Sequence, residues 1–101
     1  MNYRPRPGIV NTKICGLNVL IPSREAYPEC QNIQVLSMLW NATWHAFSRG
    51  TTIEKAVPVH VAFTKKTEAE CRASLEQFCR TMVERGFFIE VPEEGDQTER
   101  G

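Results

Sequence analysis

The sequence predicts an α+β domain in which a three-stranded antiparallel sheet is followed by three helices. Residues 9–35 hold short apolar stretches separated by turn-forming residues, which is typical of strands. Residues 36–91 instead repeat apolar side chains at helical spacing between capping residues and glycines. At 101 residues, with 42% apolar residues, the chain has the length and composition of one folded domain.

The predicted sheet begins with a hairpin. Its first strand is expected near 9–15 and its second near 17–21, with Gly16 at the bend. A third extended stretch covers about 25–35 and contains Pro28, which has no N–H to donate to a neighbouring strand. We therefore expect the third strand to be an edge strand with one unpaired side.

The first two predicted helices have recognisable start and stop residues. Ser37 is a good N-cap for helix one, and Gly50 is suited to the left-handed conformation that follows a helix. Thr51 and Glu54 have the spacing of a capping box for helix two, which we expect Pro58 to end.

Helix three follows a predicted connection at 59–66. It begins with a second capping box at Thr67–Glu70 and is closed by Gly86. Phe87–Val91 then resembles a terminal apolar anchor. Five residues of this helix share one predicted buried face: Cys71, Leu75, Phe78, Cys79 and Met82.

The composition of the termini predicts the domain boundaries. Residues 1–7 hold two prolines and two arginines, so we expect a flexible arm there. Residues 92–101 are polar and acidic, so we expect a flexible tail. The single domain is then expected to span residues 8–91.

Charge balance argues against a duplex DNA binder, and hydropathy argues against a membrane or secreted protein. Twelve basic side chains balance twelve acidic ones, whereas a duplex DNA binder normally carries a basic excess. The chain has no apolar run that could span a bilayer and no secretory signal at its start, so we expect a cytoplasmic protein with no membrane partner. Its four cysteines are then expected to be reduced thiols.

Side chains that could carry catalysis are scattered along the sequence. His45 falls within helix one and His60 in the predicted connection, and neither has an evident nucleophile beside it. The glycines are isolated, and the cysteines lack the spacing of a zinc or redox motif. We therefore expect a protein that is not an enzyme and holds no cofactor. A small thiol-dependent enzyme or metal carrier remains as a third alternative.

The unpaired strand edge is the strongest functional feature. An extended peptide that pairs with such an edge gains backbone hydrogen bonds, while neighbouring side-chain pockets select its sequence. Helix three would form the second wall of a groove if it lay beside the edge. The alternative for its exposed flank, including Gln77 and Arg80, is an ordinary solvated surface. The expected peptide contacts are Ala26, Tyr27, Glu29, Cys30, Gln31, Asn32 and Ile33 on the strand, and Cys71, Arg72, Ser74, Leu75 and Phe78 on helix three.

Several stretches of residues 8–91 resemble the PqqD family. Leu36-Ser37 leads into a helix with Trp44, which is followed by Phe47-Ser48-Arg49-Gly50-Thr51-Thr52-Ile53-Glu54-Lys55-Ala56-Val57. The stretch Met82-Val83-Glu84-Arg85-Gly86-Phe87-Phe88 is similar to the family's Leu-x-x-x-Gly-Leu/Phe ending. Two departures are Leu36-Ser37-Met38-Leu39-Trp40 in place of Leu-Asn-x-Thr-Ala, and Arg49-Gly50 in place of Asp-Gly.

This resemblance implies a winged-helix-like fold and a peptide chaperone. The leader region of a ribosomally made precursor peptide would add as a strand to the third strand, beside helix three. The protein would present that precursor to a modifying enzyme, often a radical S-adenosylmethionine (radical SAM) enzyme, and would itself catalyse nothing. The open edge also allows a strand-mediated dimer.

The alternative is a winged-helix DNA-binding regulator, which shares three helices and a small sheet. Helix three mixes arginines with glutamates, however, and this is unfavourable for contacts with phosphates.

Overall fold

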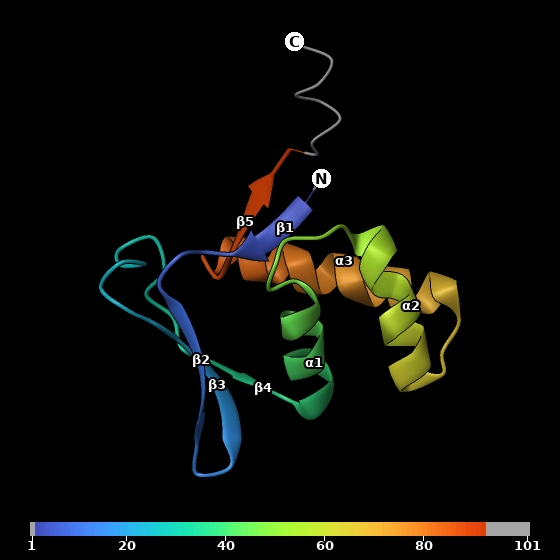
Figure 1. The fold of residues 1–101 in the computed structure, drawn as a ribbon, viewed down its shortest axis with the longest axis horizontal. Coiled ribbons are helices and arrows are strands. Elements are labelled where there is room, and N and C mark those ends of the chain that lie inside the picture. The colour runs from blue at the N-terminus through green and yellow to red at the C-terminus, as the bar shows by residue number, and fades with distance from the viewer. Residues whose placement is uncertain (1, 93–101) are drawn as a thin grey trace.

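The computed structural model describes residues 2–92 and confirms the α+β class, with a three-stranded antiparallel sheet followed by three helices. Apart from Pro92, the predicted tail lies outside the described residues. A second, two-stranded sheet joins the two ends of the described chain (Figure 1). The elements in chain order are β1 (Asn2–Pro5), β2 (Ile9–Ile14), β3 (Leu17–Pro22), β4 (Gln34–Leu36), α1 (Met38–Ala46), α2 (Ile53–Thr64), α3 (Glu68–Glu84) and β5 (Phe88–Val91).

The three-stranded sheet has the order β2-β3-β4, so β4 is an edge strand. The hairpin of β2 and β3 projects away from the helices (Figure 1). Its register pairs Ile9 with Pro22 and Ile14 with Leu17, and its bend is formed by Cys15 and Gly16, both at positive φ. The predicted hairpin is therefore confirmed.

The prediction of an arm at residues 1–7 is wrong for residues 2–5, which form β1 and pair with β5. Backbone hydrogen bonds fix this segment, including Arg6 N–H to Phe87 C=O at 2.8 Å and Tyr3 N–H to Thr51 C=O at 2.8 Å. The Tyr3 ring also lies 6.3 Å from that of Phe47, edge to face. These long-range contacts outweigh the local preference that the prolines and arginines indicate.

The third strand is much shorter than predicted, because residues 24–29 form turns and only Gln34–Leu36 pair as β4. The backbone closes on itself there, with Ala26 N–H bonded to Ser23 C=O and Cys30 N–H to Ala26 C=O, each at 3.0 Å. Ala26 and Cys30 are both buried. Their spacing of four residues fits a turn as well as a strand, so the sequence pattern does not distinguish the two.

The predicted start of helix one is confirmed, because the Ser37 hydroxyl accepts a hydrogen bond from Trp40 N–H as the N-cap of α1. The capping box of α3 is also confirmed, since Thr67 and Glu70 each accept from the other's backbone N–H. All five residues of the predicted apolar face of α3 are buried.

Two predictions for helix two are wrong. Its N-cap is Thr52, because the backbone of Thr51 pairs with Tyr3 of β1 instead. Pro58 lies inside α2, which continues to Thr64. A proline there removes one backbone hydrogen bond, and this loss is offset because Val57 and His60 bury their side chains on either side of it.

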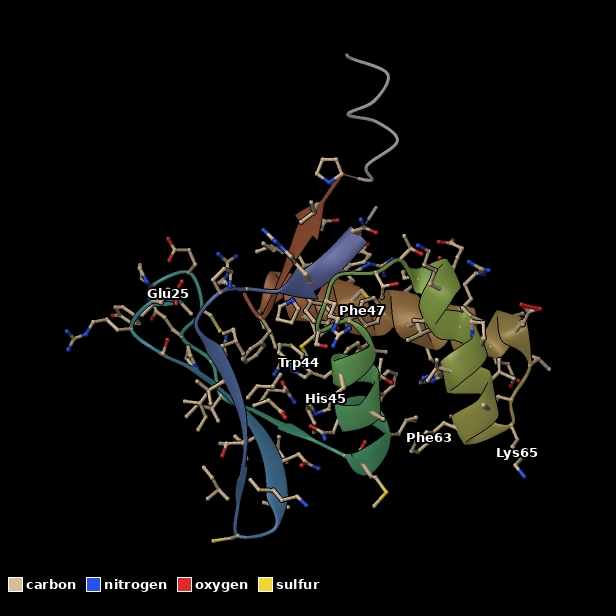
Figure 2. All side chains as sticks on the ribbon, in the orientation of Figure 1. Glu25, Trp44, His45, Phe47, Phe63 and Lys65 are labelled. Atoms are coloured by element: carbon tan, nitrogen blue, oxygen red, sulfur yellow. The ribbon has the colours of Figure 1, made fainter. Side chains whose placement is uncertain are left out.

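The main core lies between the helices, β5 and one face of the three-stranded sheet. Trp44 stacks on Phe88 with ring centroids 5.2 Å apart, and Phe47, Phe87 and Phe88 are fully buried. Figure 2 shows Trp44 and Phe47 in the interior, whereas Phe63 extends from α2 at the surface. The predicted apolar anchor after Gly86 is thus confirmed.

Candidate functional site

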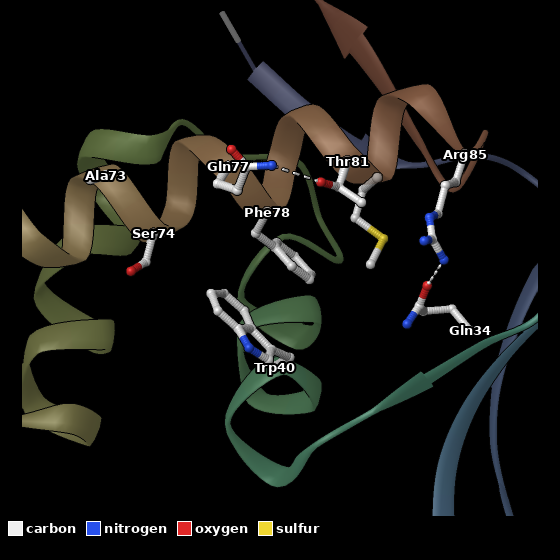
Figure 3. Close-up of a pocket in the computed structure, with 9 residues that line it drawn as sticks. Gln34, Trp40, Ala73, Ser74, Gln77, Phe78, Thr81 and Arg85 are labelled. Atoms are coloured by element: carbon white, nitrogen blue, oxygen red, sulfur yellow. Dashed lines mark hydrogen bonds between the residues drawn. The ribbon is translucent and has the colours of Figure 1, made fainter.

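A mainly apolar groove of about 550 Å³ lies along one side of α3, where α1 and β4 approach it (Figure 3). Six of its lining residues come from two adjacent rows of the α3 surface, and Arg85 follows directly at the C-terminal end of that helix. Trp40 of α1 and Gln34 of β4 complete the lining. The six residues of α3 are Ala73, Ser74, Gln77, Phe78, Thr81 and Met82.

Stacked aromatic rings support the floor of the groove. The indole of Trp40 lies against the ring of Phe78, with centroids 4.6 Å apart and an interplanar angle of 11°. The ring of His60 of α2 also lies near the indole, with centroids 5.1 Å apart, and its Nδ1 lies 3.4 Å from the Thr43 hydroxyl. The indole is therefore held between α2 and α3, so the floor is preformed.

At one end of the groove, polar contacts hold the segment that leads into β4 against the C-terminal end of α3. The Asn32 side-chain amide donates to Arg85 C=O at 3.0 Å, and the Arg85 guanidinium donates to the Gln34 side-chain oxygen. Gly86 adopts a φ of +88°, and a Cβ there would lie 3.0 Å from Cys30 Cα. This close approach sets the separation between the two walls at that end.

The side of β4 away from β3 has no neighbouring strand among residues 2–92. Residues 31–33 lead into β4 and make no backbone–backbone hydrogen bonds with other described residues. Ile33 and Val35 are 66% and 51% exposed. The Val35 C=O accepts a hydrogen bond from the Gln34 side-chain amide at 3.0 Å. Within the described chain, residues 31–33 keep their backbone N–H groups available for another extended segment.

Some of the predicted contact residues lie at this groove. Ser74 and Phe78 line it, as does Gln77, and Gln31, Asn32 and Ile33 are exposed on the approach to β4. The exposed flank of α3 is therefore part of a concave surface.

The other predicted contact residues lie away from the groove. Ala26, Cys30, Cys71 and Leu75 are buried in the core and are not available to a ligand. Tyr27 and Glu29 are exposed in the turn at 24–29 and are not part of an edge strand. The Arg72 guanidinium pairs with Glu54 of α2 at 2.8 Å, and Arg80 lines a separate polar cavity beside Tyr3. Of the expected contacts, Cys71 and Leu75 therefore do not line the groove, whereas Trp40 and Met82 do.

Sequence reasoning missed Gln34, Trp40, Ala73, Thr81, Met82 and Arg85 as groove residues. The residues of α3 could have been found, because Thr81 and Arg85 continue the helical row of Ser74 and Gln77. Trp40 could not have been found from periodicity, because its position at the groove depends on how α1 packs against α3.

The buried titratable groups belong to the core. Burial raises the pKa of the Cys79 thiol to about 12, so this thiol stays protonated at neutral pH. Burial, with a smaller effect from Lys66, lowers the pKa of His60. Cys15 alone among the four cysteines is exposed. Among residues 2–92, no three His, Cys, Asp or Glu side chains gather as metal ligands.

The helix that would read DNA in the alternative hypothesis is acidic. From Glu68 to Glu84, α3 carries four glutamates and two arginines, and one of these arginines already pairs with Glu54. Its surface is therefore a poor match for phosphates.

No family model, curated protein or solved structure matches this chain. Within the described residues, no helix is both long and apolar enough to cross a membrane.

Proposed function

We propose that this protein is a peptide-binding adaptor that takes up an extended peptide between β4 and α3. The observation that carries the proposal is that β4 is an edge strand whose Gln34 lines the apolar groove of α3. A bound peptide would add to β4 as a further antiparallel strand. It would gain backbone hydrogen bonds from 31–36 and side-chain contacts from α3.

The length of the groove suits a short extended segment. From Ala73 to Arg85 the helix rises roughly 18 Å at about 1.5 Å per residue. A strand that advances about 3.3 Å per residue covers this distance in roughly five or six residues. This matches the six residues from Gln31 to Leu36, so edge and groove can bind the same segment.

The lining indicates which side chains such a peptide would carry. The apolar lining consists mainly of Trp40, Phe78 and Met82, of which Trp40 is the most exposed and offers a surface for side chains of the bound strand. Arg85 is the one charged residue of the lining and lies at the end where Gln34 approaches α3. We expect a peptide with apolar residues in its middle and an acidic residue at the Arg85 end.

The resemblance to the PqqD family supports a biological role for this binding. The peptide would be the leader region of a ribosomally made precursor, and the adaptor would present it to a modifying enzyme such as a radical SAM enzyme. A short precursor gene beside a gene for such an enzyme would support this role directly.

Selection from a random dodecapeptide display library tests the proposal. The library should yield peptides of the expected pattern, and Ala73→Trp, which places an indole in the groove, should lower their affinity by about tenfold or more. Ala62→Trp makes the same change at an exposed site on α2 outside the lining and should have no effect. Failure to select any peptide, or equal losses in both variants, would count against the proposal. If the protein instead retarded duplex DNA on a gel in a salt-dependent way, the winged-helix DNA-binding regulator would be favoured.

A further inference from the structure

The face of the three-stranded sheet opposite the core is itself apolar. Successive side chains of a strand alternate between the two faces of a sheet, and directly paired residues share a face. Leu20 and Leu36 belong to the main core, so the other face carries the residues that alternate with them. These are Val10, Thr12 and Ile14 of β2, Leu17, Val19 and Ile21 of β3, and Val35 of β4.

This outer face, defined by those seven residues, carries no charge, and all of its residues except Val19 and Ile21 are exposed. Val10, Ile14, Leu17 and Val35 have between 47% and 53% of their surface exposed. Val19 is only 5% exposed but does not belong to the main core cluster. Its paired neighbours on that face are Thr12 and Val35. The outer face is therefore an apolar layer of which most residues, in the described part of the chain, are exposed.

The size of the outer face indicates an interaction surface. Four half-exposed aliphatic side chains, together with the exposed Ile33 just before β4, form a patch of roughly 400–500 Å², the size of the largest apolar patch on a typical monomer. Two such patches placed together would bury roughly 1,000 Å², close to the lower limit of specific interfaces.

We propose that the outer face binds the same face of a second copy of this chain. A two-fold symmetric interface must be complementary to itself, and a face without charges meets its own copy without repulsion. A sheet face also packs well against another sheet at about 10 Å separation. The hairpin projects from the helices, which leaves the outer face accessible (Figure 1).

Such a dimer differs from pairing through the strand edge. Stacking the outer faces leaves the unpaired side of β4 and the groove of α3 free, so each copy could still take up a peptide. The dimer therefore does not depend on the proposed function, and either could hold without the other.

Sedimentation velocity of the full chain tests this inference. The wild-type protein should pass from monomer to dimer as its concentration rises to roughly 500 µM, since an interface of this size gives weak association. Ile14→Glu places a carboxylate in the outer face and should weaken association by about tenfold or more. Lys13→Glu is the matched control, because Lys13 precedes Ile14 on the same strand and lies on the opposite face. It should leave association unchanged.

Val10→Glu provides a second test on the same face, at the other end of β2, with urea unfolding used to confirm that each variant is folded. A wild-type chain that remains monomeric over the whole range would overturn the inference without any variant. A dimer that Ile14→Glu and Val10→Glu both leave intact would also overturn it and would indicate pairing through the β4 edge.

Discussion

Replacing Phe78 by alanine tests whether the floor of the groove is a structural element of the fold. The Phe78 ring is 92% buried, stacks on Trp40 at 4.6 Å and meets Phe88 edge to face at 5.8 Å. Removing a large buried aromatic side chain costs about 3–5 kcal/mol through lost transfer free energy and the cavity that remains. Because one side of this ring borders the open groove, we expect Phe78→Ala to cost about 3 kcal/mol.

Urea unfolding followed by circular dichroism measures this loss as a lower midpoint at an unchanged slope. The matched control is Phe63→Ala, since Phe63 is 51% exposed on α2 and should cost less than about 1 kcal/mol. A double-mutant cycle with Trp40→Ala should give a coupling of about 1 kcal/mol for the stacked pair. Equal losses at Phe78 and Phe63, or a coupling of zero, would refute the packing described here.

Three further predictions concern the fold around the groove. Gly86→Ala should destabilise the protein by at least about 2 kcal/mol in thermal unfolding, because the new Cβ would clash with the Glu29 carbonyl oxygen and crowd Cys30, in addition to the left-handed strain. Gly16→Ala, equally left-handed but with open space around it, should cost only about 1 kcal/mol, and the reverse order would contradict this geometry. Because burial lowers the pKa of His60, stability should fall as the pH is lowered through about 6.5 and level off below the folded-state value. In His60→Phe, the midpoint of urea unfolding should therefore change little between pH 7 and the folded-state pKa of His60. If the midpoint fell with pH as steeply as in the wild type, other titrating groups would be responsible for the pH dependence. Thr67→Ala should cost about 1 kcal/mol by removing the α3 cap, whereas Thr67→Ser should cost much less.

The parts of the fold that the sequence predicted well are those set by local interactions. The capping box at Thr67 and Glu70 and the apolar row from Cys71 to Met82 are read directly from residue spacing, and the structure has both. The β2–β3 hairpin is also local, since its strands adjoin the bend at Gly16.

The parts that were predicted wrongly depend on distant contacts. Residues 2–5 form a strand only because β5, at the other end of the described chain, pairs with them. Pro58 remains within α2 because the residues around it pack into the core, which outweighs one missing hydrogen bond. The turns at 24–29 replace a strand because they bury Ala26 and Cys30.

The same distinction applies to the candidate site. The open strand edge and the exposed flank of α3 were expected from the sequence, and Ser74 and Phe78 line the groove. The contribution of Trp40 depends on how α1 packs against α3, which spacing along one helix does not specify.

Amide hydrogen exchange along residues 31–36 tests strand addition most directly. The probe is a dodecapeptide selected against this protein, added at saturation. Because alternate N–H groups of a strand point to opposite edges, peptide pairing should slow exchange at alternate residues, while amides already bonded to β3 should change little. Unchanged exchange at every amide from 31 to 36 while the peptide is bound would contradict the proposal that β4 receives the peptide.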